Sequence, residues 1–208
     1  MRGIPLHSLR ISARVPFPHP IVSAFAPARI LPISFVVSRL YPYVGSAAIR
    51  DAVDPASPRH EVKSPAEVLA WLLSQGEPWP EKREIVFTYV VLPPACLFIA
   101  DRRSEHVACA RGGEVLAAGE ITCSRRGDDI EVVETSNLST GYCPESSSYE
   151  ALDRALTAAG FGTFRPYSYP FEFRRCTGCG GIQVIKDDVF ECASCGAELS
   201  IQIRAVPS

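Results

Sequence analysis

Apolar and polar positions follow a strand pattern in the middle of the chain. Residues 84–92 and 95–100 are rich in Val, Ile, Phe, Tyr and Thr, and each segment predicts a strand. Residues 114–123 and 130–135 show a similar pattern and predict a hairpin that turns at residues 125–128. The central part of the chain is therefore expected to be β-rich.

Helix signals flank this β-rich part. Before it, Ser64 can cap a helix, Pro65 suits its first position, and Glu67 can complete a capping box. We expect this helix to end at Gly76, and a short helix to form over residues 47–53.

A second capping box is expected in residues 147–150, where Ser-Ser-Tyr-Glu precedes a helix over residues 149–159. Gly160 is expected to end that helix. Aromatic residues then alternate between Tyr167 and Phe173, which is typical of an edge strand that covers a core.

Together these elements predict an α+β fold, with a mostly antiparallel β domain and two or three helices. We expect this domain to cover residues 40–172. A four-cysteine module is expected over residues 173–203 and a short tail over residues 204–208.

Residues 1–39 differ from the rest of the chain. They contain several arginines and prolines, and no acidic residue occurs before Asp51. This composition is typical of a transit peptide, or of a start codon assigned too far upstream, and the density of prolines favours the second interpretation. On either interpretation we expect a disordered extension that carries no chemistry.

Composition narrows the choice of partners. Of the 208 residues, 47% are hydrophobic, which is enough for a buried core. The formal net charge is −2, so the chain as a whole has no electrostatic attraction to nucleic acid or to an anionic membrane. The most apolar run, residues 85–100, is interrupted by two prolines and is too short to span a bilayer.

The most specific motif is a pair of Cys-x-x-Cys-Gly sequences near the C-terminus. In each, a tight turn can present two thiolates to a metal, and residues 181–191 between them predict a strand, a polar turn and a strand. This spacing predicts a zinc ribbon with one structural zinc ion. Its four ligands are Cys176, Cys179, Cys192 and Cys195.

Two alternatives to zinc remain open for the same residues. Iron fits four thiolates, as in rubredoxin-like sites, and two disulfides would use the same cysteines. The module also contains Asp187, Asp188, Glu191 and Glu198 beside Arg174 and Arg175, a balance that favours contact with protein over contact with phosphates.

Four further cysteines are scattered through apolar or turn-like sequence, which favours free thiols in a reducing compartment, and hence a cytoplasmic protein. They are Cys96, Cys109, Cys123 and Cys143.

A second informative stretch covers residues 104–144. It resembles a β-rich module found in bacterial toxins and effectors and in plant IQ-motif proteins, and the ordered part of the chain is similar to small uncharacterised bacterial proteins with a C-terminal zinc ribbon. The matching residues are His106, Gly112, Gly113, Ala117, Ala118, Gly119, Ser139, Tyr142 and Pro144.

The resemblance implies a shared β-rich fold more than a shared activity. Thr140 and Gly141 stand where the family has Gly and His, and the absent histidine puts a catalytic use of this element in doubt. Calmodulin binding is not implied, because the Ile-Gln pairs at residues 182–183 and 201–202 lack the basic residues of an IQ motif.

The same stretch supplies candidate catalytic residues, which could line one pocket: His106, Cys109, Glu120 and Tyr142, with Glu105 and Cys143 beside them. A Cys–His pair would allow nucleophilic chemistry, and His with Tyr and Glu would suit a nucleotide-like ligand. The structural interpretation is that the histidine satisfies a backbone group, the cysteines pack as small apolar residues, and the tyrosine anchors a turn. Gly112 and Gly113 are expected to form a turn between strands, and Gly119 a bulge or a close approach.

Three functions are compatible with these patterns. The first is a zinc-binding adaptor or regulatory protein that contacts another protein through its ribbon. The second is an enzyme that acts on a nucleotide or protein substrate in a pocket near His106, Glu120 and Tyr142. The third, which the charge disfavours, is nucleic-acid binding through the ribbon.

Overall fold

The computed structural model describes residues 39–74, 83–163 and 166–200. Three expectations lie outside these ranges: the extension before Arg39, the helix end at Gly76, and the tail over residues 204–208.

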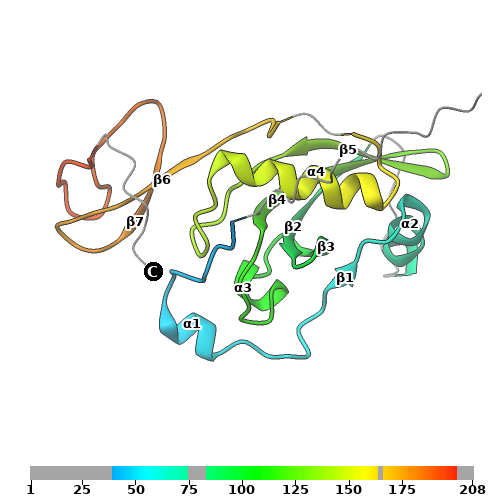
Figure 1. Cartoon of the computed structure of the whole chain (residues 1–208), viewed down its shortest axis with the longest axis horizontal. Coiled ribbons are helices and arrows are strands. Elements are labelled where there is room, and N and C mark those ends of the chain that lie inside the picture. The colour runs from blue at the N-terminus through cyan, green and yellow to red at the C-terminus, as the bar shows by residue number, and fades with distance from the viewer. Residues whose placement is uncertain (1–38, 75–82, 164–165, 201–208) are drawn as a thin grey trace, which may run out of the picture. The chain divides into compact units, whose positions relative to one another are not determined.

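The centre of the fold is a five-stranded antiparallel sheet (Figure 1). Its strand order is β1 (His60–Glu61), β3 (Cys96–Asp101), β2 (Glu84–Leu92), β4 (Ala117–Arg126) and β5 (Asp129–Thr135). The prediction for β2 is confirmed at both ends, and β3 lies one residue later than expected. Strand β4 begins later than expected but runs to Arg126, so the hairpin turns at Gly127 and Asp128 alone.

The described residues form four α-helices, where two or three were expected. They are α1 (Ala47–Asp51), α2 (Pro65–Ser74), α3 (His106–Cys109) and α4 (Tyr149–Ala158). Within the described part of the chain, no helix is long and apolar enough to cross a membrane.

Helix α3 was not expected, because Gly112 and Gly113 were predicted to form a turn between strands. They instead follow α3 and lead into β4: the Gly112 N–H donates to the carbonyl of Val107 at 2.8 Å, and Gly112 has a φ of 77°. A four-residue helix has no periodic pattern that a sequence can reveal.

The two expected capping boxes differ in outcome. At α2, the Ser64 Oγ accepts a hydrogen bond from the Glu67 N–H at 3.2 Å, which confirms Ser64 as the predicted cap. At α4 the prediction is wrong, because residues Ser146–Ser148 form a 3₁₀ turn and no side chain caps the helix. The Ser148 hydroxyl is bonded to the Tyr167 hydroxyl instead, at 2.8 Å.

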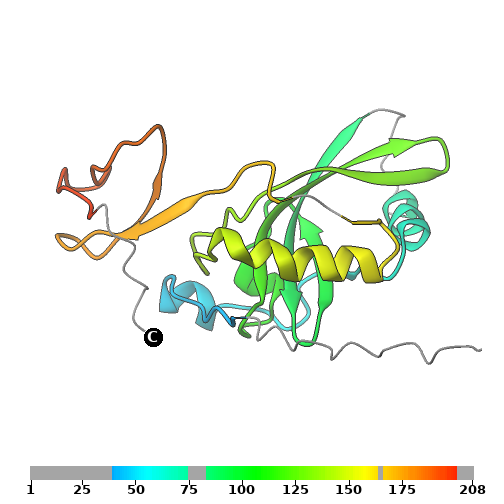
Figure 2. The ribbon, with the colours of Figure 1, turned by 45° about the horizontal axis from the view of Figure 1, so that its top comes forward.

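Alternation along the strands gives the sheet two buried faces. On one face, Phe87, Tyr89 and Val91 of β2 join the apolar cluster that contains Leu152 and Leu156 of α4. Figure 2 shows α4 lying across this face. Val90, which lies between Tyr89 and Val91 on β2, belongs to a second cluster that includes Val107 and Cys109 of α3. Each face of the sheet is therefore covered by helical residues.

A second, two-stranded sheet lies towards the C-terminus. It pairs β6 (Glu172–Arg175) with β7 (Ile182–Ile185) in antiparallel register. We expected β7 to pair with the residues that follow it in the chain, and this was wrong: a single bridge between Lys186 and Val189 is all that forms there. The polar turn is present, with positive φ at Asp187 and Asp188.

Candidate functional site

The two Cys-x-x-Cys sequences fold into knuckles with the same backbone hydrogen bonds. In the first, the Cys176 N–H donates to the carbonyl of Gly181 at 2.8 Å, and the Gly180 N–H donates to the carbonyl of Cys176 at 2.9 Å. In the second, Cys192 bonds to Ala197 and Gly196 to Cys192 in the same way, both at 2.8 Å. The glycines have φ values of 73° and 72°, a conformation that side chains other than glycine rarely adopt.

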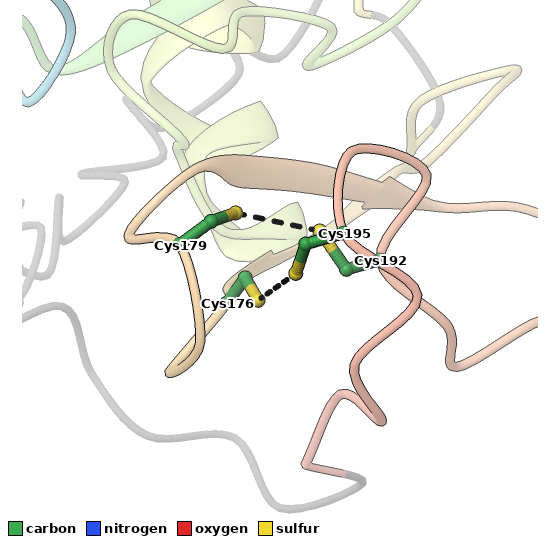
Figure 3. A group of neighbouring side chains, drawn as sticks. All are labelled: Cys176, Cys179, Cys192 and Cys195. Atoms are coloured by element: carbon green, nitrogen blue, oxygen red, sulfur yellow. Dashed lines mark hydrogen bonds between the residues drawn. The ribbon is translucent and has the colours of Figure 1, made fainter.

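This local geometry brings the four sulfur atoms together (Figure 3). All four lie within 4.8 Å of one another, and two pairs, Cys176 with Cys195 and Cys179 with Cys192, are separated by 3.6 Å. Sulfurs bound at 2.3 Å to a tetrahedral zinc lie about 3.8 Å apart. The cluster therefore has the dimensions of a four-thiolate metal site, as the spacing predicted.

The disulfide alternative does not agree with the structure. All eight cysteines lie among the described residues, and each is free of a disulfide bond. The close sulfur pairs in the cluster are separated by well over the length of an S–S bond, about 2.05 Å.

Neighbouring groups shift the pKa values of two cluster thiols in opposite directions. The backbone hydrogen bond with Ala197 lowers the pKa of Cys195, but hydrogen bonds with the other three thiols outweigh it and raise the pKa to about 12. The Gly178 N–H donates to the Cys176 sulfur at 3.3 Å. Burial raises the pKa of the Cys192 thiol, but hydrogen bonds from the backbone of Ser194 and Cys195 and from the neighbouring thiols outweigh it, and the pKa falls to about 6. Cys192 is thus the sulfur expected to lose its proton first, and metal binding requires that loss.

The cluster is closed as well as compact. Cys176 and Cys192 are buried, and Leu199 packs beside them, whereas Cys179 and Cys195 lie at the surface. Four sulfur ligands fill a tetrahedral coordination sphere and leave no position for a catalytic water. Within the described ranges, this is the one group of three or more His, Cys, Asp or Glu side chains placed to hold a metal ion.

The structure places His106 at the start of α3, where it is half-buried. Its Nε2–H donates to the carbonyl of Gly119 at 3.0 Å, so the neutral ring carries its proton on Nε2. Burial lowers the pKa of His106, against the opposing effects of that hydrogen bond and of the Glu105 and Glu120 carboxylates. The histidine therefore satisfies a backbone group, in agreement with the structural interpretation.

Gly119 itself is required by a close approach between two backbone segments. A Cβ atom at this position would lie 2.0 Å from the carbonyl oxygen of Ser136. The sequence expectation of a bulge or close approach at Gly119 is thus confirmed as a close approach.

The thiols of Cys109 and Cys143 are not activated. Cys109 is 1% exposed, and burial raises the pKa of its thiol to about 12. Burial likewise raises the pKa of Cys143 to about 12, and its sulfur lies 3.3 Å from the carbonyl of Thr140. Both remain protonated at neutral pH, and a protonated thiol is a poor nucleophile.

Two further candidate side chains, those of Tyr142 and Glu120, already have partners in the structure. The Tyr142 hydroxyl donates to the carbonyl of Gly113 at 2.7 Å. The Glu120 carboxylate pairs with Arg102 at 3.1 Å.

A cavity of about 380 Å³ lies where the five-stranded domain meets β6. Of the candidate catalytic residues, Tyr142 is in its lining, and His106, Cys109 and Glu120 are not. The lining is mainly aromatic, proline and paired charged residues: Arg39, Tyr41, Pro42, Val44, Tyr142, Cys143, Pro144, Glu145, Ser146, Phe171, Glu172, Phe173 and Arg174.

Asn137 holds the walls of this cavity together. Its side chain is fully buried, and its Nδ2 donates to the carbonyl of Pro144 at 2.7 Å and to that of Phe171 at 2.9 Å. Its Oδ1 accepts a hydrogen bond from the Phe171 N–H at 2.7 Å. Sequence reasoning missed Asn137, because only its place directly after a predicted strand distinguishes it from an ordinary turn asparagine.

Comparison of the chain with protein-family models, with curated proteins and with solved structures gave no match. The function must therefore be argued from the residues themselves.

Proposed function

We propose that Cys176, Cys179, Cys192 and Cys195 hold one structural zinc ion, and that the protein is a non-enzymatic adaptor that presents this module to another protein. In this proposal residues 40–172 form the supporting domain and residues 173–203 the zinc ribbon. The four scattered thiols favour a reducing compartment, so we place the protein in the cytoplasm.

The observation that carries the proposal is the closed four-sulfur cluster, with all sulfurs within 4.8 Å of one another. Zinc is the usual ion for short tetrathiolate modules, and a filled coordination sphere makes it structural. The buried core of the module consists of two of these cysteines and Leu199 among the described residues. A core this small needs a metal in order to fold.

An interaction role fits the module better than catalysis. The thiols of Cys109 and Cys143, with pKa values near 12, supply no nucleophile at neutral pH. The resemblance of residues 104–144 to toxin and IQ-motif modules supports a β-rich domain without adding an activity. A ribbon beside an aromatic cavity is a suitable surface for a partner protein.

The metal part of the proposal is tested by titrating the metal-free protein with Co²⁺. We expect one cobalt per chain with the absorption bands of a tetrahedral four-thiolate site, and displacement of the cobalt by Zn²⁺. The variant Cys192→Ser should lose these bands, and the control Cys143→Ser should keep them. Iron retained by the purified protein in place of zinc would contradict the assignment.

The adaptor part is tested by affinity capture from the source cells with the intact protein, Cys192→Ser and Cys96→Ser, a control that alters a thiol outside both the cluster and the cavity lining. A partner retained by the intact protein and by Cys96→Ser, and lost by Cys192→Ser, is the expected result. Equal capture by all three proteins would remove the ribbon from the interface.

A further inference from the structure

Strand β6 has one paired edge and one open edge. Its ladder with β7 joins Phe173 to Val184 and Arg175 to Ile182, and the bond from the Cys176 N–H to the Gly181 carbonyl extends this register by one residue. In an antiparallel ladder, alternate residues turn their N–H and C=O groups towards the partner strand. Because Cys176 faces β7, the backbone groups of Phe173 and Arg175 face away from it.

The first position on the open edge is already occupied, by a side chain that imitates a strand. Phe171 lies two residues before Phe173, so its backbone groups face the same edge. Its N–H and C=O bond to the Oδ1 and Nδ2 of Asn137 at 2.7 and 2.9 Å. This is the two-bond pairing that a residue of a neighbouring strand would make. Asn137 thus occupies the open edge at Phe171, and the backbone groups of Phe173 and Arg175 are left for another partner.

The next two positions have no strand beside them in the described part of the chain. The Phe173 carbonyl accepts a hydrogen bond from the Arg174 guanidinium at 2.9 Å. The register of the ladder turns the Phe173 N–H away from β7, and outside that ladder no backbone hydrogen bond of this N–H occurs among the described residues. An open edge of this kind is a template for a strand from another molecule.

The cavity borders β6. Residues 171–174 belong to its lining, together with Tyr41, Tyr142 and Pro144. Its volume, about 380 Å³, falls within the usual range for ligand pockets, about 300–1,000 Å³. A strand added to β6 would therefore have an apolar recess for one of its side chains.

The charges around the cavity cancel. Arg39 is paired with Glu145, and Arg174 with Glu172 at 2.8 Å. The Tyr142 hydroxyl is already bonded to Gly113. A neutral, apolar side chain is the complementary occupant, because a charged one would lose its hydration without gaining an unpaired partner.

We propose that an extended segment of a partner protein adds as a strand to the open edge of β6, pairing with Phe173 and Arg175, and inserts one uncharged aromatic side chain into the cavity. This inference rests on the adaptor proposal and names the chemistry of the partner. The backbone pairing supplies the affinity, and the cavity selects the anchor residue.

Hydrogen exchange by NMR on the zinc-loaded full chain tests the open edge. In the free protein, we expect the amides of Phe173 and Arg175 to exchange quickly and that of Arg174 to be protected by β7. The probe is a capped peptide, Ser-Thr-Val-Phe-Val-Thr-Ser, which should slow exchange at Phe173 and Arg175. Protection of Phe173 before peptide is added would overturn the proposal, and so would shifts confined to β7 or β1.

The anchor is tested by replacing the central Phe of the peptide with Ala or Asp. Loss of a buried aromatic side chain should weaken binding about ten- to hundredfold, and Asp should weaken it at least as much. Equal affinity for the three peptides would overturn the assignment of the cavity.

The strand pairing is tested with two isomeric peptides that carry N-methyl groups at alternate positions. One isomer loses the N–H groups that face β6, and the other loses those that face solvent. We expect the first to bind at least about tenfold more weakly and the second to bind like the parent peptide. Equal effects of both isomers, or binding of free p-cresol with the affinity of the Phe peptide, would overturn strand addition.

These outcomes are separate from those of the adaptor test. If no peptide binds while the intact protein still captures a partner that Cys192→Ser loses, the β6 site is wrong and the adaptor proposal stands. If peptides bind in the expected pattern and no partner is captured, the edge is a binding site and the adaptor role is wrong.

Discussion

The five-stranded domain and the β6–β7 module are stabilised by different means. The domain has an apolar cluster on each face of its sheet, with side chains from β2, β3, β4, α3 and α4. In the module, the described residues contribute three members to a buried core, and two of them, Cys176 and Cys192, belong to the sulfur cluster. The domain can therefore fold on hydrophobic burial, whereas the module, on the function proposed above, depends on a bound metal.

The two regions nevertheless meet through specific polar contacts. The Asn137 side chain of the domain bonds to both the N–H and the C=O of Phe171. The Arg175 guanidinium donates to the carbonyl of Val44 at 3.3 Å. Because the two regions are stabilised differently, we expect each to unfold without the other. Across these contacts, the unfolding of one region should change the stability of the other only slightly.

The largest effect should come from Cys192→Ser. A structural zinc site contributes on the order of 10 kcal/mol or more to the folding of a small module, and three ligands retain little of this. We expect the variant to lose its zinc and the protection of β6 and β7, while the free energy of unfolding of the domain changes by less than about 1 kcal/mol. Zinc analysis and urea unfolding followed by hydrogen exchange measure the two parts.

The matched control is Cys143→Ser, which alters a thiol outside the cluster. It should keep one zinc per chain, and the amides of the module and of the domain should both stay protected from hydrogen exchange. Loss of the domain transition in Cys192→Ser would show that the two regions fold as one unit.

The converse experiment is Gly119→Ala, which should destabilise the domain and spare the module. The added Cβ would lie 2.0 Å from the Ser136 carbonyl oxygen, so two strands must move apart. We expect a loss of about 3 kcal/mol or more in the unfolding free energy of the domain, with zinc content unchanged.

Gly113→Ala is the control, because a Cβ there would meet its nearest atom, the Ala110 carbonyl oxygen, at 3.3 Å. Its effect should stay below about 1 kcal/mol. Similar losses in both variants would contradict the close approach at Gly119.

Asn137→Ala should weaken the junction between the regions. It removes three hydrogen bonds and leaves the buried carbonyls of Pro144 and Phe171 and the Phe171 N–H without that partner. We expect the free energy of unfolding to fall by about 2–4 kcal/mol, because buried polar groups that lose their partners have no hydrogen bond to replace those they made with water. Chemical unfolding measures the loss, and unchanged stability would show that water replaces the amide.

The smallest effect concerns His106 and pH. Burial lowers its pKa in the folded state, so the unfolded chain binds this proton more tightly. Stability contributed by the neutral form is complete above the unfolded pKa of about 6.5 and is lost as the pH falls towards the folded pKa. The free energy of unfolding changes with pH by at most about 1.4 kcal/mol per pH unit, the slope for one proton.

The variant His106→Gln keeps an N–H donor for Gly119 and removes the titration. Its unfolding free energy should therefore vary less between pH 7 and pH 5 than that of the intact protein. Parallel pH profiles for the two proteins would contradict a buried neutral His106.

The elements that sequence could predict are those with local signals. Strand β2 has a continuous run of β-branched and aromatic residues, and helix α2 has Ser64 as its cap, so both were found. The sulfur cluster was found because two similar knuckles specify their own turns through Gly180 and Gly196.

The failures involve partners that local pattern does not encode. Strand β7 pairs with β6, across the first knuckle, instead of with the residues that follow it. Ser148 bonds to Tyr167 instead of capping α4, and Asn137 serves residues seven and thirty-four positions away. Each depends on which segments the tertiary fold brings together.

We infer that the module folds on one metal ion and the domain on its apolar core. The most direct measurement is hydrogen exchange, read by mass spectrometry, on the full chain before and after zinc is removed with a chelator. We expect peptides covering β6, β7 and the four cysteines to lose protection when zinc is removed, while peptides from β2 and β4 keep theirs. Added zinc should restore the protection of the first set. Unchanged protection of the module without metal would contradict this inference.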